Sequence, residues 1–296
     1  MSIIRQPTSS DIGKLILLGA IWASAFLCIE IALRSFAPLV IASWRILIAT
    51  LVLLPVILIR RETWPRGSKN WMLIFLAGFF YNAVPFSLIS WGQQHISSGM
   101  AALLMSCGPF IALALSHWLT GDEKFSWIKL VSVVLGFSGV LVLIGVQVLE
   151  GTGSAILGQL AMVAAVSCYI FSGLMIRRIQ SGSALMLSAT ILGSSCFYMI
   201  PGIWLFTDPF PVHVPIEPWL ALLFLGLVPT AFAYIIRVQL LQQVGSNFLA
   251  LVSYLIPIFG LLWSWLFLDQ IPDSSIWLAL LLIFAGLAVT RLQPRQ

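Results

Sequence analysis

The sequence predicts an all-α membrane protein in which ten transmembrane helices form two inverted five-helix repeats. The first observation is composition: 60% of the 296 residues are hydrophobic, 8% are charged, and the mean hydropathy is +1.05. This leaves too little polar surface for a soluble globule of this length. The second observation is an internal repeat, because residues 226–267 align with residues 78–119 at a shift of 148. The chain therefore contains a duplication.

Ten apolar runs predict the individual helices. A hydrocarbon core of roughly 30 Å needs about 20 residues of helix, and none of the runs shows the alternation of polar and apolar residues that a transmembrane barrel requires. The first run aligns with residues 157–171 at a shift of 145, so we interpret it as a helix and not as a cleaved signal. The expected helices are residues 12–33, 37–59, 71–90, 97–119, 128–148, 156–176, 184–206, 218–239, 246–268 and 275–291.

The basic residues predict the orientation of these helices. The loops on the side of the N-terminus carry twelve of them, whereas the opposite loops carry only Arg34. By the positive-inside rule, both termini are expected in the cytoplasm, with the protein in the bacterial inner membrane. The twelve are Arg5, Lys14, Arg60, Arg61, Arg66, Lys69, Lys124, Lys129, Arg177, Arg178, Arg291 and Arg295.

Five crossings in each copy predict that the second copy is inverted. We expect residues 1–150 to form the first repeat and residues 151–296 the second, which must then begin on the far side of the membrane. The charges agree: the loop at residues 60–69 is basic, whereas its equivalent at residues 207–217 contains no Lys or Arg. Inverted repeats are a design of secondary transporters, in which the substrate binds near the bilayer midplane between two halves that rock around it.

Several short motifs recur in order along this duplication. They are Trp22-Ala-Ser-Ala-Phe26, Ala42-Ser-Trp-Arg45, Pro109 followed by Gly121-Asp-Glu123, Pro229-Thr-Ala-Phe-Ala-Tyr234, and Ser253-Tyr-Leu-Ile-Pro257 followed by Leu268-Asp269. With them, the whole chain resembles the EamA family of the drug/metabolite transporter (DMT) superfamily. The resemblance implies a ten-helix inner-membrane carrier of small metabolites, often exporting amino acids, and is greatest to bacterial aromatic amino-acid exporters of the YddG type. One departure is Gln270, which stands where the first repeat has Glu123.

Polar and aromatic side chains near the helix centres mark the expected substrate cavity. In hydrocarbon such groups cost free energy unless they lie inside the protein or beside water. They fall on the first, third, fourth, sixth, eighth and ninth helices, so the fifth and tenth should lie outside; serines on these helices have the alternative of bonding their own backbone. The expected substrate-binding residues are Trp22, Tyr81, Asn82, Tyr169, Thr230, Tyr234, Ser253 and Tyr254.

Two prolines and one ion pair are expected to take part in gating. Pro109 and Pro257 lie at equivalent places in the fourth and ninth helices, where each gives either a flexible point or a static bend. Glu30 and Arg45 lie at similar depth on either side of an outer turn. We expect them to pair and to tie the first two helices at an outer gate; the alternative is that each side chain extends separately to the interface.

The remaining ionisable residues argue against catalysis. The three His and four Cys are scattered without a CxxC pair, so we expect no enzyme activity, metal or cofactor. The expected partners are the lipid bilayer and a small-molecule substrate, with no nucleic acid and a monomeric carrier. Without a fixed charge at its centre, the cavity suits amino acids, aromatic ones included; the alternative is a lipophilic drug or cation. Transport is expected to be uncoupled, or to use an ion held by backbone groups.

Overall fold

The computed structural model describes residues 5–112, 127–149, 153–180, 182–206, 208, 211 and 213–290. The structure of these residues is helical, with no strand among them. The elements are α1 (Ser9–Ala32), α2 (Pro38–Ile59), α3 (Ser68–Gly78), η1 (Phe79–Ala83), α4 (Val84–Gly92), α5 (Ser98–Met105), α7 (Trp127–Leu149), α8 (Gly153–Ile176), α9 (Ala184–Phe206), α10 (Ile216–Leu225), η2 (Gly226–Phe232), α11 (Ala233–Gln243), α12 (Ser246–Leu249), α13 (Val252–Leu268) and α14 (Ser274–Thr290).

Length and composition make this a multi-pass membrane protein. In the described part of the chain, six helical stretches are long and apolar enough to cross a bilayer: Ser9–Ala32, Pro38–Ile59, Ser68–Gly92, Gly153–Gly173, Ala184–Pro201 and Ile216–Gln243. Shorter apolar helices accompany them at Ser98–Ala112, Leu130–Gly139, Val252–Leu268 and Ser274–Gly286. The predicted total of ten crossings stays a prediction.

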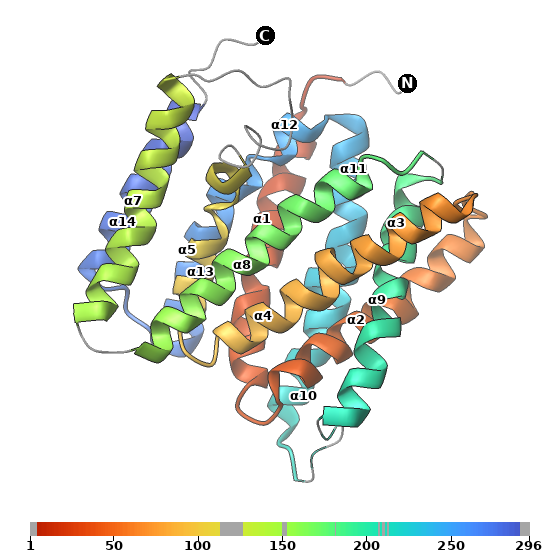
Figure 1. Ribbon diagram of the computed structural model, residues 1–296, viewed down its shortest axis with the longest axis horizontal. Helices are drawn as coiled ribbons and strands as arrows, with labels where there is room; N and C mark the ends of the chain where they lie inside the picture. The colour runs from red at the N-terminus through yellow and green to blue at the C-terminus, as the bar shows by residue number, and fades with distance from the viewer. Residues whose placement is uncertain are drawn as a thin grey trace.

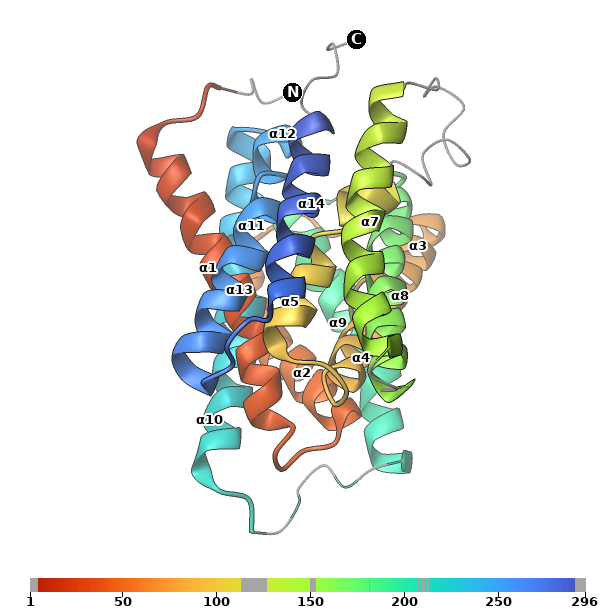
Figure 2. The same cartoon turned by 90° about the vertical axis from the view of Figure 1, so that its left-hand side faces the viewer.

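The helices stand side by side in one bundle, with α1 beginning and α14 ending at the same end (Figure 1). Helices α7 and α14 pack against each other along one side of the bundle, as Figures 1 and 2 both show. Glycines bring the two backbones close: a Cβ on Gly139 would lie 2.9 Å from the carbonyl oxygen of Ala279, and one on Gly286 would lie 2.8 Å from that of Ser132. Since no larger residue fits there, the pair forms a tightly packed unit.

The rest of the bundle packs in pairs that the duplication relates. Helix α2 packs against its repeat equivalent α9, and α5 packs against α13, which belongs to the equivalent segment of the second copy. Helix α4 packs against α8, and its equivalent at the shift of 148, α11, packs against α1. The α4–α8 contact is close because a Cβ on Gly158 would lie 2.8 Å from the carbonyl oxygen of Gly92. Seven of these helices, α1, α2, α4, α5, α8, α11 and α13, surround an internal pocket.

Candidate functional site

Two π-helical turns interrupt the bundle at equivalent positions of the duplication. Turn η1 joins α3 to α4 and turn η2 joins α10 to α11, and the shift of 148 places Gly226, the first residue of η2, over Gly78. A π-helical turn is rare, and in many proteins it marks a functional site. Here η1 contributes Tyr81 and η2 contributes Pro229 to the lining of one internal pocket.

Pro229 determines the local chemistry of η2. Because it has no N–H, Pro229 cannot donate to the carbonyl of Leu225 four residues earlier, and in the π-helical turn this carbonyl pairs with residue 230, five residues on. The hydroxyl of the fully buried Thr230 donates a hydrogen bond to that carbonyl at 2.8 Å. The same hydroxyl accepts one from Nε of Arg45 on α2, also at 2.8 Å. A single hydroxyl therefore adds a second bond to this carbonyl and holds a charged side chain of another helix.

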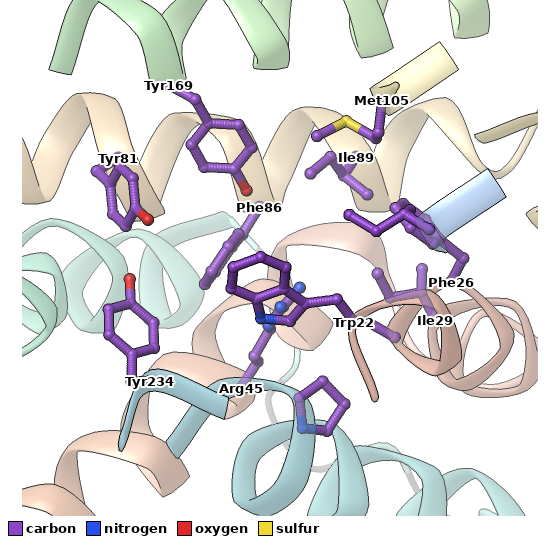
Figure 3. Close-up of a pocket in the computed structure, with 13 residues that line it drawn as sticks. Trp22, Phe26, Ile29, Arg45, Tyr81, Phe86, Ile89, Met105, Tyr169 and Tyr234 are labelled. Carbon is purple, nitrogen blue, oxygen red and sulfur yellow. The ribbon is translucent and has the colours of Figure 1, made fainter. Parts of the chain in front are cut away.

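The pocket has a volume of about 230 Å³ and lies inside the bundle (Figure 3). Its lining comes from α1, α4, α5, α8, α11 and α13, from the two π-helical turns, and from α2. The lining residues are Trp22, Ala25, Phe26, Ile29, Arg45, Tyr81, Phe86, Ile89, Met105, Tyr169, Pro229, Tyr234 and Ile256. Among the described residues, all six segments expected to line the cavity do so, and neither α7 nor α14 contributes.

One end of the pocket carries hydroxyl groups and the other is apolar. The ring of Tyr81 lies edge-on to Tyr169 at 5.3 Å and to Tyr234 at 6.3 Å between centroids. Figure 3 shows these three tyrosines at one end, whereas Phe26 and Ile29 lie at the other. A solute bound here therefore meets hydrogen-bonding groups on one side and hydrocarbon on the other.

Asn82 stands behind this polar end. Its side chain is fully buried, and its Oδ1 accepts a hydrogen bond from the hydroxyl of Tyr234 at 3.0 Å. Its Nδ2 donates to the hydroxyl of Ser195 on α9 at 3.0 Å, and this hydroxyl donates to the carbonyl of Gly78 at 3.0 Å. Asn82 thus fixes the orientation of Tyr234 through a chain of satisfied polar groups.

Half of the expected substrate-binding residues line the pocket, namely Trp22, Tyr81, Tyr169 and Tyr234. Asn82 and Thr230 lie one layer behind it, and each bonds a lining residue. Ser253 and Tyr254 are not among the lining residues. The ring of Tyr254 lies 5.9 Å from that of Phe284 on α14. Ser24, Ser106 and Ser167 behave as the alternative predicted, because each hydroxyl donates to a carbonyl of its own helical segment; that of Ser106 bonds Leu103 at 2.6 Å.

The predicted hinge prolines lie in different local structures. Pro109 follows the end of α5, where the N–H of Cys107 bonds the carbonyl of Leu104 and the N–H of Phe110 bonds that of Cys107. Pro257 is buried inside α13, and its segment is instead interrupted between α12 and α13. The duplication therefore does not reproduce the bend itself, and the hinge role of the two prolines stays a prediction.

The predicted ion pair between Glu30 and Arg45 is not formed, although the structure describes both residues. The Arg45 guanidinium lies 3.8 Å from the ring centroid of Phe86, and its Nε donates to Thr230. Glu30 accepts a hydrogen bond from the N–H of Ser98 at 2.8 Å and another from the side-chain amide of Gln270. Similar depth did not bring the pair together, because the two side chains leave their helices in different directions.

Arg45 is consequently the pocket residue that the sequence reasoning misplaced. It is 7% exposed and lines the cavity, so the expectation of a cavity without a fixed charge was wrong. The signal that could have found it is general: an ionisable residue within an apolar membrane helix faces a cavity or a partner more often than lipid.

A membrane-embedded helical bundle around an amphipathic pocket is the architecture of a membrane transport protein. Among the described residues, no group of three His, Cys, Asp or Glu side chains could hold a metal ion. Comparison with known proteins gives the family: the chain belongs to the EamA-like transporter family, which matches residues 12–145 and 153–292. The family and the relatives are transporters, not enzymes.

Individual relatives cover most of the chain. An uncharacterised transporter, YdfC of Bacillus subtilis strain 168, is 28% identical over 93% of this chain and 89% of its own length. An S-adenosylmethionine/S-adenosylhomocysteine transporter of Chlamydia muridarum is 26% identical over 84% of this chain and 81% of its own. One solved crystal structure has a TM-score of 0.66 at 18% identity, over 97% of this chain and 98% of that one, so the two share a fold.

Proposed function

We propose that the protein exports amino acids, aromatic and other apolar ones included, across the bacterial inner membrane by alternating access. The observation that carries this proposal is the pocket between both family-matched segments, in which Trp22 and Tyr81 come from the first and Tyr169 and Tyr234 from the second. A site shared by two halves is the arrangement around which secondary transporters rock. The outward direction is the one that the family resemblance implies.

The size of the pocket supports a solute no larger than a single amino acid. Its volume of about 230 Å³ lies below the roughly 300–1,000 Å³ of pockets for drug-sized ligands. The tyrosine end offers hydrogen-bonding groups to the polar backbone of an amino acid, and the end near Phe26 offers hydrocarbon to its apolar side chain.

One relative supports the chemical class of the solute. It is the S-adenosylmethionine/S-adenosylhomocysteine transporter, and both of its named solutes are metabolites with an α-amino-acid group.

The alternative solute, a lipophilic drug or cation, has the apolar end of the pocket in its favour. The buried charge of Arg45 opposes a cation, because two like charges in a site of low dielectric repel each other strongly. An amino acid, which carries both charges, meets no such barrier.

The proposed topology is two inverted five-helix repeats, residues 1–150 and 151–296, with both termini in the cytoplasm. The common end at which α1 begins and α14 ends (Figure 1) supports an even number of crossings. The π-helical turns at equivalent positions support the duplication.

Counterflow in proteoliposomes tests the function. Vesicles with purified protein are preloaded with one unlabelled amino acid at a time, and uptake of labelled phenylalanine is followed. We expect aromatic and apolar amino acids to accelerate uptake. Trp22→Ala should reduce the uptake about tenfold or more, which corresponds to a loss of only about 1.4 kcal/mol in binding. Trp277→Ala should leave the uptake unchanged, because Trp277 is exposed on α14. Absence of acceleration by every amino acid would refute the proposal.

A further inference from the structure

Arg45 places a permanent positive charge in the wall of the pocket. The side chain extends from α2 toward the middle of the cavity (Figure 3) and is 7% exposed. A guanidinium keeps its proton under all physiological conditions. The wall of the pocket therefore carries a positive charge that no physiological change of pH removes.

The part of the chain that the structure describes supplies no anion for this charge. The described residues contain one ion pair, between Arg5 and Asp11 near the start of α1, and Arg45 has neutral neighbours, Thr230 and Phe86. Thr230 takes the Nε donor, whereas the two terminal amino groups of the guanidinium have no hydrogen bond within the described structure. Burying an unpaired charge costs several kcal/mol, a cost that an arriving anion would offset.

The geometry of the guanidinium favours one kind of anion. Its terminal amino groups form a fork that matches the two oxygens of a carboxylate. Among the described residues that line the pocket there is no second Lys or Arg, and Arg237, 5.8 Å from the ring centroid of Tyr81, is not one of them. The lining therefore lacks the additional charge that a phosphate dianion would require. The Phe86 ring on one face of the fork and Thr230 at its Nε hold the fork in place, so little entropy is lost when an anion binds.

We propose that Arg45 binds the carboxylate of the transported solute and thereby selects zwitterions and monocarboxylates against amines and cations. This inference rests on the proposed function and specifies its substrate class. The solute's ammonium group then lies toward the hydroxyl and ring face of Tyr169, which attract cations, because the ring of Tyr81 already faces the guanidinium of Arg237 at 5.8 Å. Its side chain occupies the apolar end near Phe26 and Ile29.

The test compares solutes that differ in one charged group. L-phenylalanine has both groups, phenethylamine and L-phenylalaninamide lack the carboxylate, and 3-phenylpropionate lacks the amine. We expect exchange with phenylalanine and weaker exchange with phenylpropionate, and at least tenfold slower exchange with the other two. Arg45→Gln should lower phenylalanine exchange about 10- to 100-fold, as expected for the loss of a charge-assisted bond, and Arg45→Lys should lower it less. Arg34→Gln, at an exposed loop position, is the control.

A binding measurement keeps the test independent of transport. Phenylalanine and phenylpropionate should raise the melting temperature of the purified wild-type protein in detergent, and this shift should vanish in Arg45→Gln. The unliganded variant should melt at or above the wild-type temperature, because the substitution removes an unpaired buried charge.

The outcomes separate the two proposals. If phenylalaninamide exchanges as fast as phenylalanine, or if Arg45→Gln keeps the discrimination, the carboxylate anchor is refuted while amino-acid transport stands. If monocarboxylates exchange and no amino acid does, the anchor stands while amino-acid transport is refuted. Exchange confined to amines or cations refutes both.

Discussion

Glu30 on α1 accepts a hydrogen bond from the backbone N–H of Ser98, the first residue of α5, at 2.8 Å. Its second oxygen accepts the side-chain amide of Gln270, just beyond α13. The carboxylate therefore joins three helices, and at the start of α5 it also faces the positive end of the helix dipole. Gln270 is the residue that departs from the acidic pair of the first repeat, and here its amide can donate where a Glu could not.

We expect Glu30→Ala to lower the stability of the protein by about 1–3 kcal/mol, because it leaves a buried N–H and an amide without their acceptor. The melting temperature in detergent measures this loss. Glu217→Ala is the matched control, since Glu217 is exposed in the first turn of α10 and its interaction with the helix dipole is worth only about 0.3–1 kcal/mol. Equal losses for the two variants would show that the Glu30 contacts contribute nothing specific.

Thr230 offers a second prediction, on the helix that Pro229 interrupts. Thr230→Val keeps the shape of the side chain but removes the hydroxyl bond to the carbonyl of Leu225 and leaves the Nε of Arg45 without its acceptor. We expect a loss of about 2–3 kcal/mol, mainly from the unsatisfied charged donor. Thr230→Ser keeps the hydroxyl and should lose much less. Thermal unfolding of the purified variants measures both.

A double variant isolates the role of the proline. In Thr230→Val, the further change Pro229→Ala supplies an N–H that can donate to the carbonyl of Leu225. Part of the lost stability should therefore return. If Pro229→Ala destabilises the valine variant further, an N–H at residue 229 does not compensate for the lost hydroxyl bond.

The sequence was sufficient for most of the long helices but not for their interruptions or for the directions of their side chains. Hydrophobic length predicted α9 as residues 184–206, and the helix runs from Ala184 to Phe206, because a membrane fixes the length that an apolar helix must have. The position of α7 and α14 outside the pocket lining was expected, because few polar side chains lie at their centres; their packing against each other was not predicted. Both features depend on composition along a helix, which a sequence displays directly.

The pocket was harder to predict because it depends on the angular position of each residue. Tyr254 and Tyr234 are both tyrosines within predicted membrane-spanning segments, yet only Tyr234 lines the cavity. When a helix is apolar all round, no amphipathic pattern shows which face is inward. Arg45 was misplaced for the same reason: its depth was estimated along the chain, whereas its partner Thr230 became visible only when α2 and η2 were placed side by side.

The α4–α8 contact gives a prediction on packing. A Cβ on Gly158 would lie 2.8 Å from the carbonyl oxygen of Gly92 and 2.9 Å from the Cβ of His95. Gly158→Ala must push the two helices apart and should cost about 1–3 kcal/mol. Gly173→Ala on the same helix is the control, because nothing lies within 4 Å of its Cβ position, and it should be neutral or slightly stabilising. Melting temperatures in the reverse order would show that α4 and α8 are not in tight contact.

The chemistry of the lining gives the last prediction, that exchange is not coupled to protons. No Asp, Glu or His is among the residues that line the pocket within the described chain, and the nearest candidate from the sequence, Glu30, is bound by α5 and Gln270 outside it. A carrier driven by protons needs an ionisable group that responds to the substrate. We therefore expect an amino-acid gradient to produce no pH change inside proteoliposomes loaded with a pH-sensitive dye. The exchange rate should also stay constant between roughly pH 6 and pH 8, the range in which only a histidine-like group titrates. A substrate-driven pH change that disappears in Glu30→Gln would overturn this expectation and identify Glu30 as the proton carrier. The variant is informative because Gln keeps an acceptor oxygen for the N–H of Ser98 but cannot bind or release a proton.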